Sequence, residues 1–266
     1  MLKKRLLTLL CLVLVSIPLS AQGVDETSAA SRYDSYAGKT SMGPAIVAST
    51  SWVGAIVEAA GASNVLVLAP IELRHPPEYD FSPQDIMTAS RADLVFWAGY
   101  EGFIGKLVSA AQIPDKNVVQ VQTNNAPDQL ASSVQSVAKL LGNEEAFTSW
   151  KRSLDDLSSR LLDGAQRQQT SSTRAVVQFH QQAFARYAGY DVVAVFGPQD
   201  LSLGDVTAIE ALDPDIIIDN WHSPQGEPFK SLGRTYVQLI NFPGPFMTRS
   251  ILDVLTYNAT QLQLIH

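Results

Sequence analysis

The sequence has 266 residues, of which 46% are hydrophobic and 17% are charged, and its formal net charge is −7. A chain of this charge is a poor partner for nucleic acid or anionic lipid, and it is compatible with cations. Its length allows one large domain or two domains of about 100 residues each.

Residues 1–21 have the pattern of a secretory signal peptide. Basic residues at 3–5 precede an apolar stretch at 6–19, which is too short and too asymmetrically flanked for a membrane span. We therefore expect cleavage after Ala21 and export to the periplasm or the extracellular space. Removing the three basic residues changes the formal charge from −7 to −10. The only cysteine, Cys11, is removed too, which leaves no disulfide and no thiolate metal site.

Residues 22–41 are polar and small, and we expect them to form a flexible leader. The next segment, 42–143, is predicted to form an N-terminal α/β lobe. Its β-branched runs are continuous rather than alternating, which is typical of strands buried on both faces of a parallel sheet. The expected strands are 45–50, 64–70, 93–99 and 117–123, and the expected helices are 52–61, 82–92, 101–111 and 128–143. Ser82 and Pro83 read as a helix N-cap with proline at the first helical position.

A long helix is predicted for 144–170, where the sequence has no strand signal. Apolar residues recur there at steps of three and four, which gives the helix one apolar face. These residues are Phe147, Trp150, Leu154, Leu157 and Leu161.

Strand and helix patterns alternate again in 171–266, which is predicted to form a C-terminal α/β lobe. The expected strands are 174–180, 191–197, 214–220 and 235–240, and the expected helices are 181–189, 205–213 and 247–265. The predicted fold is therefore α/β with two lobes, each a mostly parallel four-stranded sheet flanked by helices. A long α-helix joins the lobes, and a ligand cleft lies between them at the carboxyl ends of the strands.

The placement of histidines indicates the chemistry of this cleft. His75 and His222 each follow a predicted strand and His180 ends one, which is where open parallel sheets bind their ligands. Neutral imidazole is the commonest metal ligand, and three nitrogens plus one oxygen suit tetrahedral Zn²⁺. Asp219 also ends a strand. It is a candidate for the oxygen ligand or for the acid that orients an imidazole, and equally for a turn or helix-cap residue.

Two stretches resemble the metal-binding (zinc and manganese) solute-receptor family of ABC transporters. The first is "LRHPPEYDFSPQDIMTASRADLVFWAGYEGFIGKL", which contains His75, and the second is "AVVQFHQQAFARYAGYDVVAVFG", which contains His180. A third and weaker match is "LDPDIIIDNWHSP", in which Asp219 corresponds to an acid that the family carries at a strand end. The resemblance spans roughly 44–266.

This resemblance implies a monomeric, non-enzymatic receptor that carries Zn²⁺, or Mn²⁺, to a permease in the membrane. It places His75 and His180 among the metal ligands. Two further ligands of the family have no counterpart: 123–130 contains no histidine and 239–246 contains no aspartate. His222 and Asp219 are the candidate replacements. An imidazole-rich, carboxylate-poor set favours zinc over manganese.

Two alternatives stay open at the level of the sequence. The same fold also suits a metal chelate or a cobalamin-like ligand, because two expected metal ligands are missing. An exported metal-dependent hydrolase would need an open coordination position and a general base near the metal.

Overall fold

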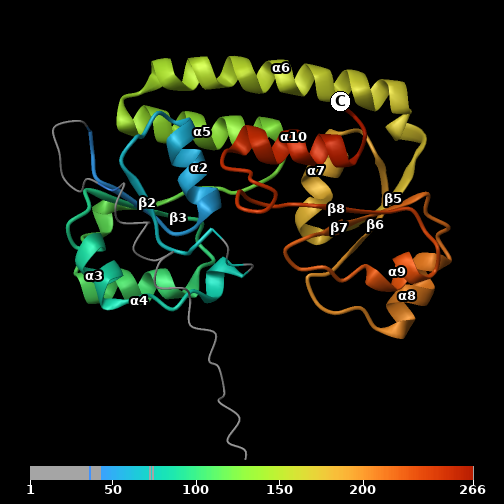
Figure 1. Ribbon diagram of the computed structural model, residues 1–266, viewed down its shortest axis with the longest axis horizontal. Helices are drawn as coiled ribbons and strands as arrows, with labels where there is room; N and C mark the ends of the chain where they lie inside the picture. The colour runs from blue at the N-terminus through green and yellow to red at the C-terminus, as the bar shows by residue number, and fades with distance from the viewer. Residues whose placement is uncertain (1–35, 37–42, 72, 74, 266) are drawn as a thin grey trace, which may run out of the picture.

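The computed structural model describes Tyr36, 43–71, Leu73 and 75–265 (Figure 1). The expected signal peptide lies outside the described residues, and so does the expected leader apart from Tyr36. None of the helices in the described ranges combines the length and the apolar character that a membrane crossing requires.

The N-terminal sheet has four parallel strands in the order β2-β1-β3-β4. The strands are β1 (Ile46–Ala48), β2 (Val65–Val67), β3 (Leu94–Trp97) and β4 (Val118–Gln120). The helices and 3-10 turns of this part are α2 (Ser51–Ala59), η1 (Pro76–Glu78), α3 (Pro83–Ala89), α4 (Gly102–Ala111) and η2 (Asp115–Asn117). The start of α3 is as predicted, because the Ser82 side chain accepts from the Asp85 N–H in a reciprocal capping box.

Two helices follow the first sheet: α5 (Pro127–Leu141) and α6 (Glu144–Gln168). The 25 residues of α6 match the predicted long helix, and Leu154, Leu157 and Leu161 are buried along one face. Figure 1 shows α6 running across the top of both lobes, with α5 and α10 beneath it. The long helix therefore spans both lobes and links them on the side where α5 and α10 lie.

The second sheet is also parallel and has the order β6-β5-β7-β8. Its strands are β5 (Arg174–Gln178), β6 (Asp191–Phe196), β7 (Ile216–Asn220) and β8 (Tyr236–Leu239). The helices and turns are η3 (Thr170–Ser172), η4 (Phe179–Gln181), α7 (Gln182–Tyr187), α8 (Leu203–Glu210), α9 (Glu227–Ser231) and α10 (Ile251–Gln261). The two four-stranded parallel sheets confirm the predicted fold class.

Two details of the C-terminal part differ from the prediction. The short helix α9 was not predicted, because five residues are too few for a periodic pattern. Helix α10 begins at Ile251 rather than at 247, because Phe246 and Met247 have positive φ angles of 55° and 60°, which a right-handed helix excludes. The Ser250 side chain then caps the helix by accepting from the Asp253 N–H.

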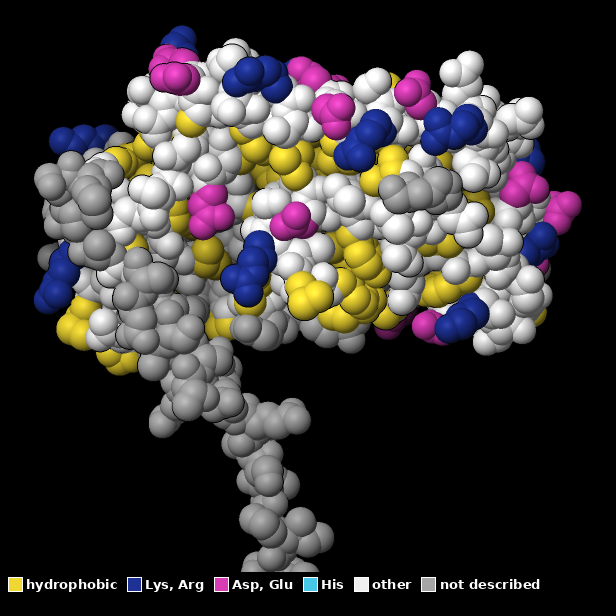
Figure 2. All heavy atoms as spheres, turned by 45° about the horizontal axis from the view of Figure 1, so that its top comes forward, with side chains coloured by type: hydrophobic (Ala, Val, Ile, Leu, Met, Phe, Trp, Pro, Cys, Tyr) yellow, Lys and Arg dark blue, Asp and Glu magenta, His cyan; other side chains and the backbone are white. Residues whose placement is uncertain are grey.

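One hydrophobic cluster extends through both lobes. It includes Ile46 from β1, Ile56 from α2, Leu157 from α6, Ile218 from β7 and Val254 from α10, all at most 4% exposed. The predicted lobe boundaries at 143 and 170 stay predictions, because the packing is continuous across them. Figure 2 shows charged side chains of both signs scattered over the face on the α6 side of the molecule.

Candidate ligand-binding cleft

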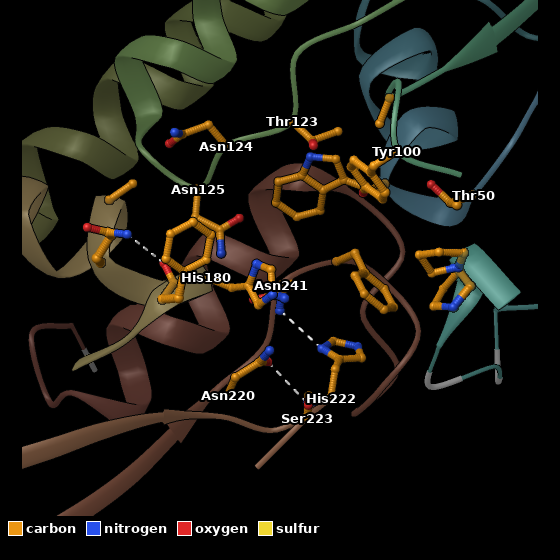
Figure 3. Close-up of a pocket in the computed structure, with 18 of the residues that line it drawn as sticks. Thr50, Tyr100, Thr123, Asn124, Asn125, His180, Asn220, His222, Ser223 and Asn241 are labelled. Atoms are coloured by element: carbon orange, nitrogen blue, oxygen red, sulfur yellow. Dashed lines mark hydrogen bonds between the residues drawn. The ribbon is translucent and has the colours of Figure 1, made fainter. Parts of the chain in front are cut away.

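A cavity of about 710 Å³ lies between the two lobes. Figure 3 shows its labelled residues converging from both lobes, with Thr50 and Tyr100 on one side and His180, Asn220 and His222 on another. The connection after β4 contributes Thr123, Asn124 and Asn125. The cavity therefore lies where the carboxyl ends of parallel strands meet, as predicted for a ligand cleft.

His75 and His180 both line the cavity, and they come from opposite lobes. His75 is exposed and immediately precedes η1, where Pro76 and Pro77 restrict the backbone. The backbone N–H of His180 donates to the Gln178 side chain at 2.7 Å, which fixes the start of η4. The His180 side chain is exposed to the open cleft, yet desolvation by the surrounding protein lowers its pKa, which favours the neutral, ligand-competent imidazole.

His222 lines the same cavity but is almost fully buried, with 3% of its surface exposed. Its Nδ1 accepts a hydrogen bond of 3.2 Å from the Asn241 backbone N–H. The ring lies 3.6 Å from the Phe242 ring between centroids and meets the edge of Trp221 at 5.2 Å. A neutral imidazole whose Nδ1 accepts carries its hydrogen on Nε2. This hydrogen bond occupies the Nδ1 lone pair of His222, and the metal-ligand role of His222 stays a prediction.

Asp219 does not line the cavity and is fully buried behind it. Its carboxylate accepts from the Asn220, Gln225 and Gly226 backbone N–H groups at 2.7, 3.1 and 2.8 Å, and from the Tyr236 hydroxyl at 2.6 Å. Burial raises its pKa more than these hydrogen bonds lower it. These hydrogen bonds use Asp219 to hold the loop after β7, as in the alternative turn role, and its role as an oxygen ligand stays a prediction.

The N-terminal lobe has a corresponding buried acid that the sequence did not single out. Glu101 is 1% exposed, and its carboxylate accepts from the Ser49 hydroxyl at 2.5 Å and from the Ala98 and Tyr100 N–H groups at 3.0 and 3.2 Å. Among the residues that the structure describes, no three His, Cys, Asp or Glu side chains form a group that could hold one metal ion. The predicted four-ligand cluster is therefore not assembled in this conformation.

Asparagine side chains, missed from the sequence, supply much of the polar cleft wall: Asn124, Asn125, Asn220 and Asn241. Gln181, at the end of η4, organises two of them. Its amide NH₂ donates to the Leu239 carbonyl at 3.3 Å and to the Asn241 side-chain oxygen, and its own oxygen accepts from the Asn125 NH₂ at 3.3 Å. The only available signal was their position in the sequence, since Asn220 is the last residue of a strand and Asn241 follows one.

This fold and cleft define a class of two-lobed α/β proteins with a cavity between two parallel sheets. The fold is shared with several solved metal-binding proteins. The manganese complex of the solute-binding protein FpvC from Pseudomonas aeruginosa superposes with a TM-score of 0.65 at 17% identity, covering 83% of this chain and 97% of that one. The periplasmic zinc-binding protein TroA from Treponema pallidum gives 0.61 at 15% identity, covering 84% and 100%.

A third solved structure extends the same comparison. The laminin-binding protein Lmb of Streptococcus agalactiae, described as an adhesin with metal-transporting activity, gives a TM-score of 0.62 at 16% identity, covering 84% of this chain and 100% of that one. No family model matches the sequence, and no curated protein matches it. The chain therefore has the fold of these three solved proteins, at 15–17% sequence identity.

Proposed function

We propose that the protein is the exported binding component of an ABC transporter. It binds a transition-metal ion in the cleft, with zinc preferred over manganese, and delivers that ion to a membrane permease. The observation that carries the proposal is the placement of two imidazoles, His75 and His180, on one cavity but on opposite lobes. The shared fold of the zinc-binding TroA and the manganese-bound FpvC supports it.

The chemistry of the two histidines fits a metal cargo. Imidazole nitrogen is an intermediate ligand that suits zinc well, whereas manganese prefers carboxylate oxygen. Desolvation lowers the pKa of His180, which favours the neutral imidazole that a metal requires. His75 is carried by a proline-restricted turn, which lowers the entropy that its ordering costs on binding.

The remaining predicted residues fit a supporting role in this proposal. The Gln225 backbone donates to Asp219, and the Gln178 side chain donates to the Gln225 side chain at 3.2 Å. Gln178 in turn accepts from the His180 backbone. Asp219 thereby anchors the contacts that position His180. The function is binding and release rather than catalysis, and the solved proteins named above are described as metal-binding or metal-transporting.

The proposal is tested by removing each imidazole separately. His75→Ala and His180→Ala are each expected to weaken Zn²⁺ binding by about tenfold or more, because each removes one of the two proposed imidazole ligands of the ion. Isothermal titration on tag-free protein measures the affinity, and His266→Ala, which changes a histidine outside the predicted ligand set, is the matched control. Unchanged affinity in both cleft variants would refute the proposed site.

A further inference from the structure

The electrostatic character of the cleft wall is unusual for a site that binds a bare divalent cation. Among the described residues that line the cavity there is no aspartate or glutamate, although the whole chain contains 26 acidic residues. Two acids that adjoin lining residues in the sequence, Glu101 and Asp219, are buried and bound to backbone N–H groups of their own loops. The lining includes one side chain with a permanent charge, the cationic guanidinium of Arg186. A divalent ion held by neutral imidazoles would therefore meet no compensating negative charge from the wall.

The cleft asparagines present donors to the cavity, and their orientation is fixed by their partners. The Asn124 oxygen accepts from the Ala126 backbone N–H at 2.8 Å, and the Asn220 oxygen accepts from the His222 backbone N–H at 3.1 Å. Because a backbone N–H can only donate, each amide must turn its oxygen toward that group. The NH₂ group is then the end left for a ligand.

A hydrogen bond with Gln181 orients the Asn241 amide in the same way, with its NH₂ group left for a ligand. The NH₂ group of Gln181 is identified by its bond to the Leu239 carbonyl, which can only accept. The Asn241 oxygen therefore accepts from Gln181, and its NH₂ is the remaining polar end. Asn125 is the exception: its NH₂ donates to the Gln181 oxygen, which leaves the Asn125 oxygen as an acceptor.

Two further features of the wall favour the binding of a negatively charged ligand. Trp52 lines the cavity at 3% exposure, and its indole N–H has no hydrogen-bond partner within the described part of the chain. The same side chain belongs to the first turn of α2, whose N-cap residue, Thr50, also lines the cavity. The amino end of a helix carries a partial positive charge that attracts anions.

The size of the cavity independently indicates a small organic ligand. A volume of about 710 Å³ lies in the range of roughly 300–1,000 Å³ that is typical of sites for small organic ligands. The aromatic rings of Trp52, Phe179 and Phe242 contribute apolar surface to the wall. A metal ion alone would leave most of this space to water.

We propose that the cargo is an anionic metal chelate, in which a carboxylate-bearing small molecule holds the ion. This inference rests on the proposed metal-receptor function. The chelator supplies the ligands and negative charge that the wall lacks, and its carboxylates accept from Arg186 and from the NH₂ groups of Asn124, Asn220 and Asn241. His75 and His180 each replace one water on the metal. The anionic chelator thus accepts hydrogen bonds from the cleft wall, and the two imidazoles coordinate the metal.

The test uses Zn²⁺ and its one-to-one complex with nitrilotriacetate, which has a single net negative charge and leaves coordination positions for imidazoles. Tag-free protein is dialysed to equilibrium with radioactive zinc and separately labelled nitrilotriacetate. We expect both labels to be retained together, and zinc retention to rise about tenfold or more when nitrilotriacetate is added. Nitrilotriacetate without metal should bind at least tenfold more weakly than the complex.

Asn124→Asp is the diagnostic variant, because aspartate keeps the acceptor for the Ala126 N–H and replaces only the exposed donor by a negative oxygen. It should weaken binding of the complex about fivefold or more, and Arg186→Gln should have a similar effect. The matched controls are Gln166→Glu and Arg160→Gln, which make the same chemical changes on α6. These controls should leave the affinity unchanged.

The outcomes separate this inference from the function on which it rests. Retention of zinc without the chelator, falling as nitrilotriacetate is added, would overturn the chelate and leave a receptor for the bare ion. Retention of nitrilotriacetate that does not depend on metal would overturn both and indicate an organic anion. Retention of neither label would also overturn both. Equal affinities in Asn124→Asp, Arg186→Gln and the native protein would overturn the assigned donors.

Discussion

Single side chains in the cleft take their roles from hydrogen-bond partners that lie far away in the sequence. His75, His180 and His222 were predicted from their places after strands, and all three line the cavity. The role of His222 depends on a backbone N–H that lies 19 residues away, at Asn241. Such partners are fixed by the register of loops in space, so no local pattern in the sequence reveals them. The donor character of the asparagines was missed for the same reason.

Asp219 gives the prediction at this scale. Asp219→Ala would leave the buried Gly226 N–H and the Asn220 N–H without their acceptor, and would remove the partner of the Tyr236 hydroxyl. We expect a loss of about 3 kcal/mol in the free energy of unfolding, because buried donors without partners cost about 1–3 kcal/mol each. Urea denaturation measures this loss.

The matched control is Asp253→Ala, which removes an exposed acid that caps α10. Solvent can replace the lost hydrogen bonds there, so the loss should be clearly smaller than for Asp219. Equal losses for the two variants would contradict the role of Asp219 as the anchor of the loop after β7.

At the scale of elements, strands and long helices were predictable because their burial imposes a pattern. The parallel strands are continuous apolar runs, and α6 has a stripe of leucines. Short elements such as α9 and η4 were missed, because a single turn has too few residues to show a period. The start of α10 was misplaced because two left-handed residues, Phe246 and Met247, interrupt a sequence that otherwise reads as helical.

Close packing of the C-terminal segment against α6 gives the prediction for this scale. A Cβ atom at Gly164 would lie 1.8 Å from the Leu264 carbonyl oxygen, which is backbone and cannot turn away. Gly164→Ala should therefore destabilise the protein by about 2–4 kcal/mol, although alanine favours a helix by about 1 kcal/mol over glycine. Thermal unfolding followed by circular dichroism measures the change.

Gly105 in α4 is the control for helix propensity alone, because a Cβ atom there meets nothing within 4 Å. Gly105→Ala should raise the free energy of unfolding by about 0.5–1 kcal/mol. A stabilising effect of both substitutions would show that the C-terminal segment does not pack closely on α6.

At the scale of the whole molecule, the arrangement of two lobes was predictable from the repeated alternation of strands and helices around one long helix. The packing of both lobes around one hydrophobic core was not predictable, because it depends on which faces of the helices meet. Helix α10, which is last in the chain, contacts α2 of the first lobe as well as α6. The lobes therefore share one large hydrophobic core, and each also has a smaller buried cluster of its own.

This shared core predicts that the two lobes unfold together. Separating them would expose Ile56, Leu157 and Val254, which are at most 4% exposed in the folded protein, so neither lobe keeps its stability alone. Calorimetry should show one transition with equal calorimetric and van't Hoff enthalpies. Variants that retain only Trp97, in β3, or only Trp221, beside β7, should show coincident fluorescence midpoints in urea. Two separated midpoints would mean that the lobes are independent folding units, and that the cleft between them is free to change its width without disturbing a common core.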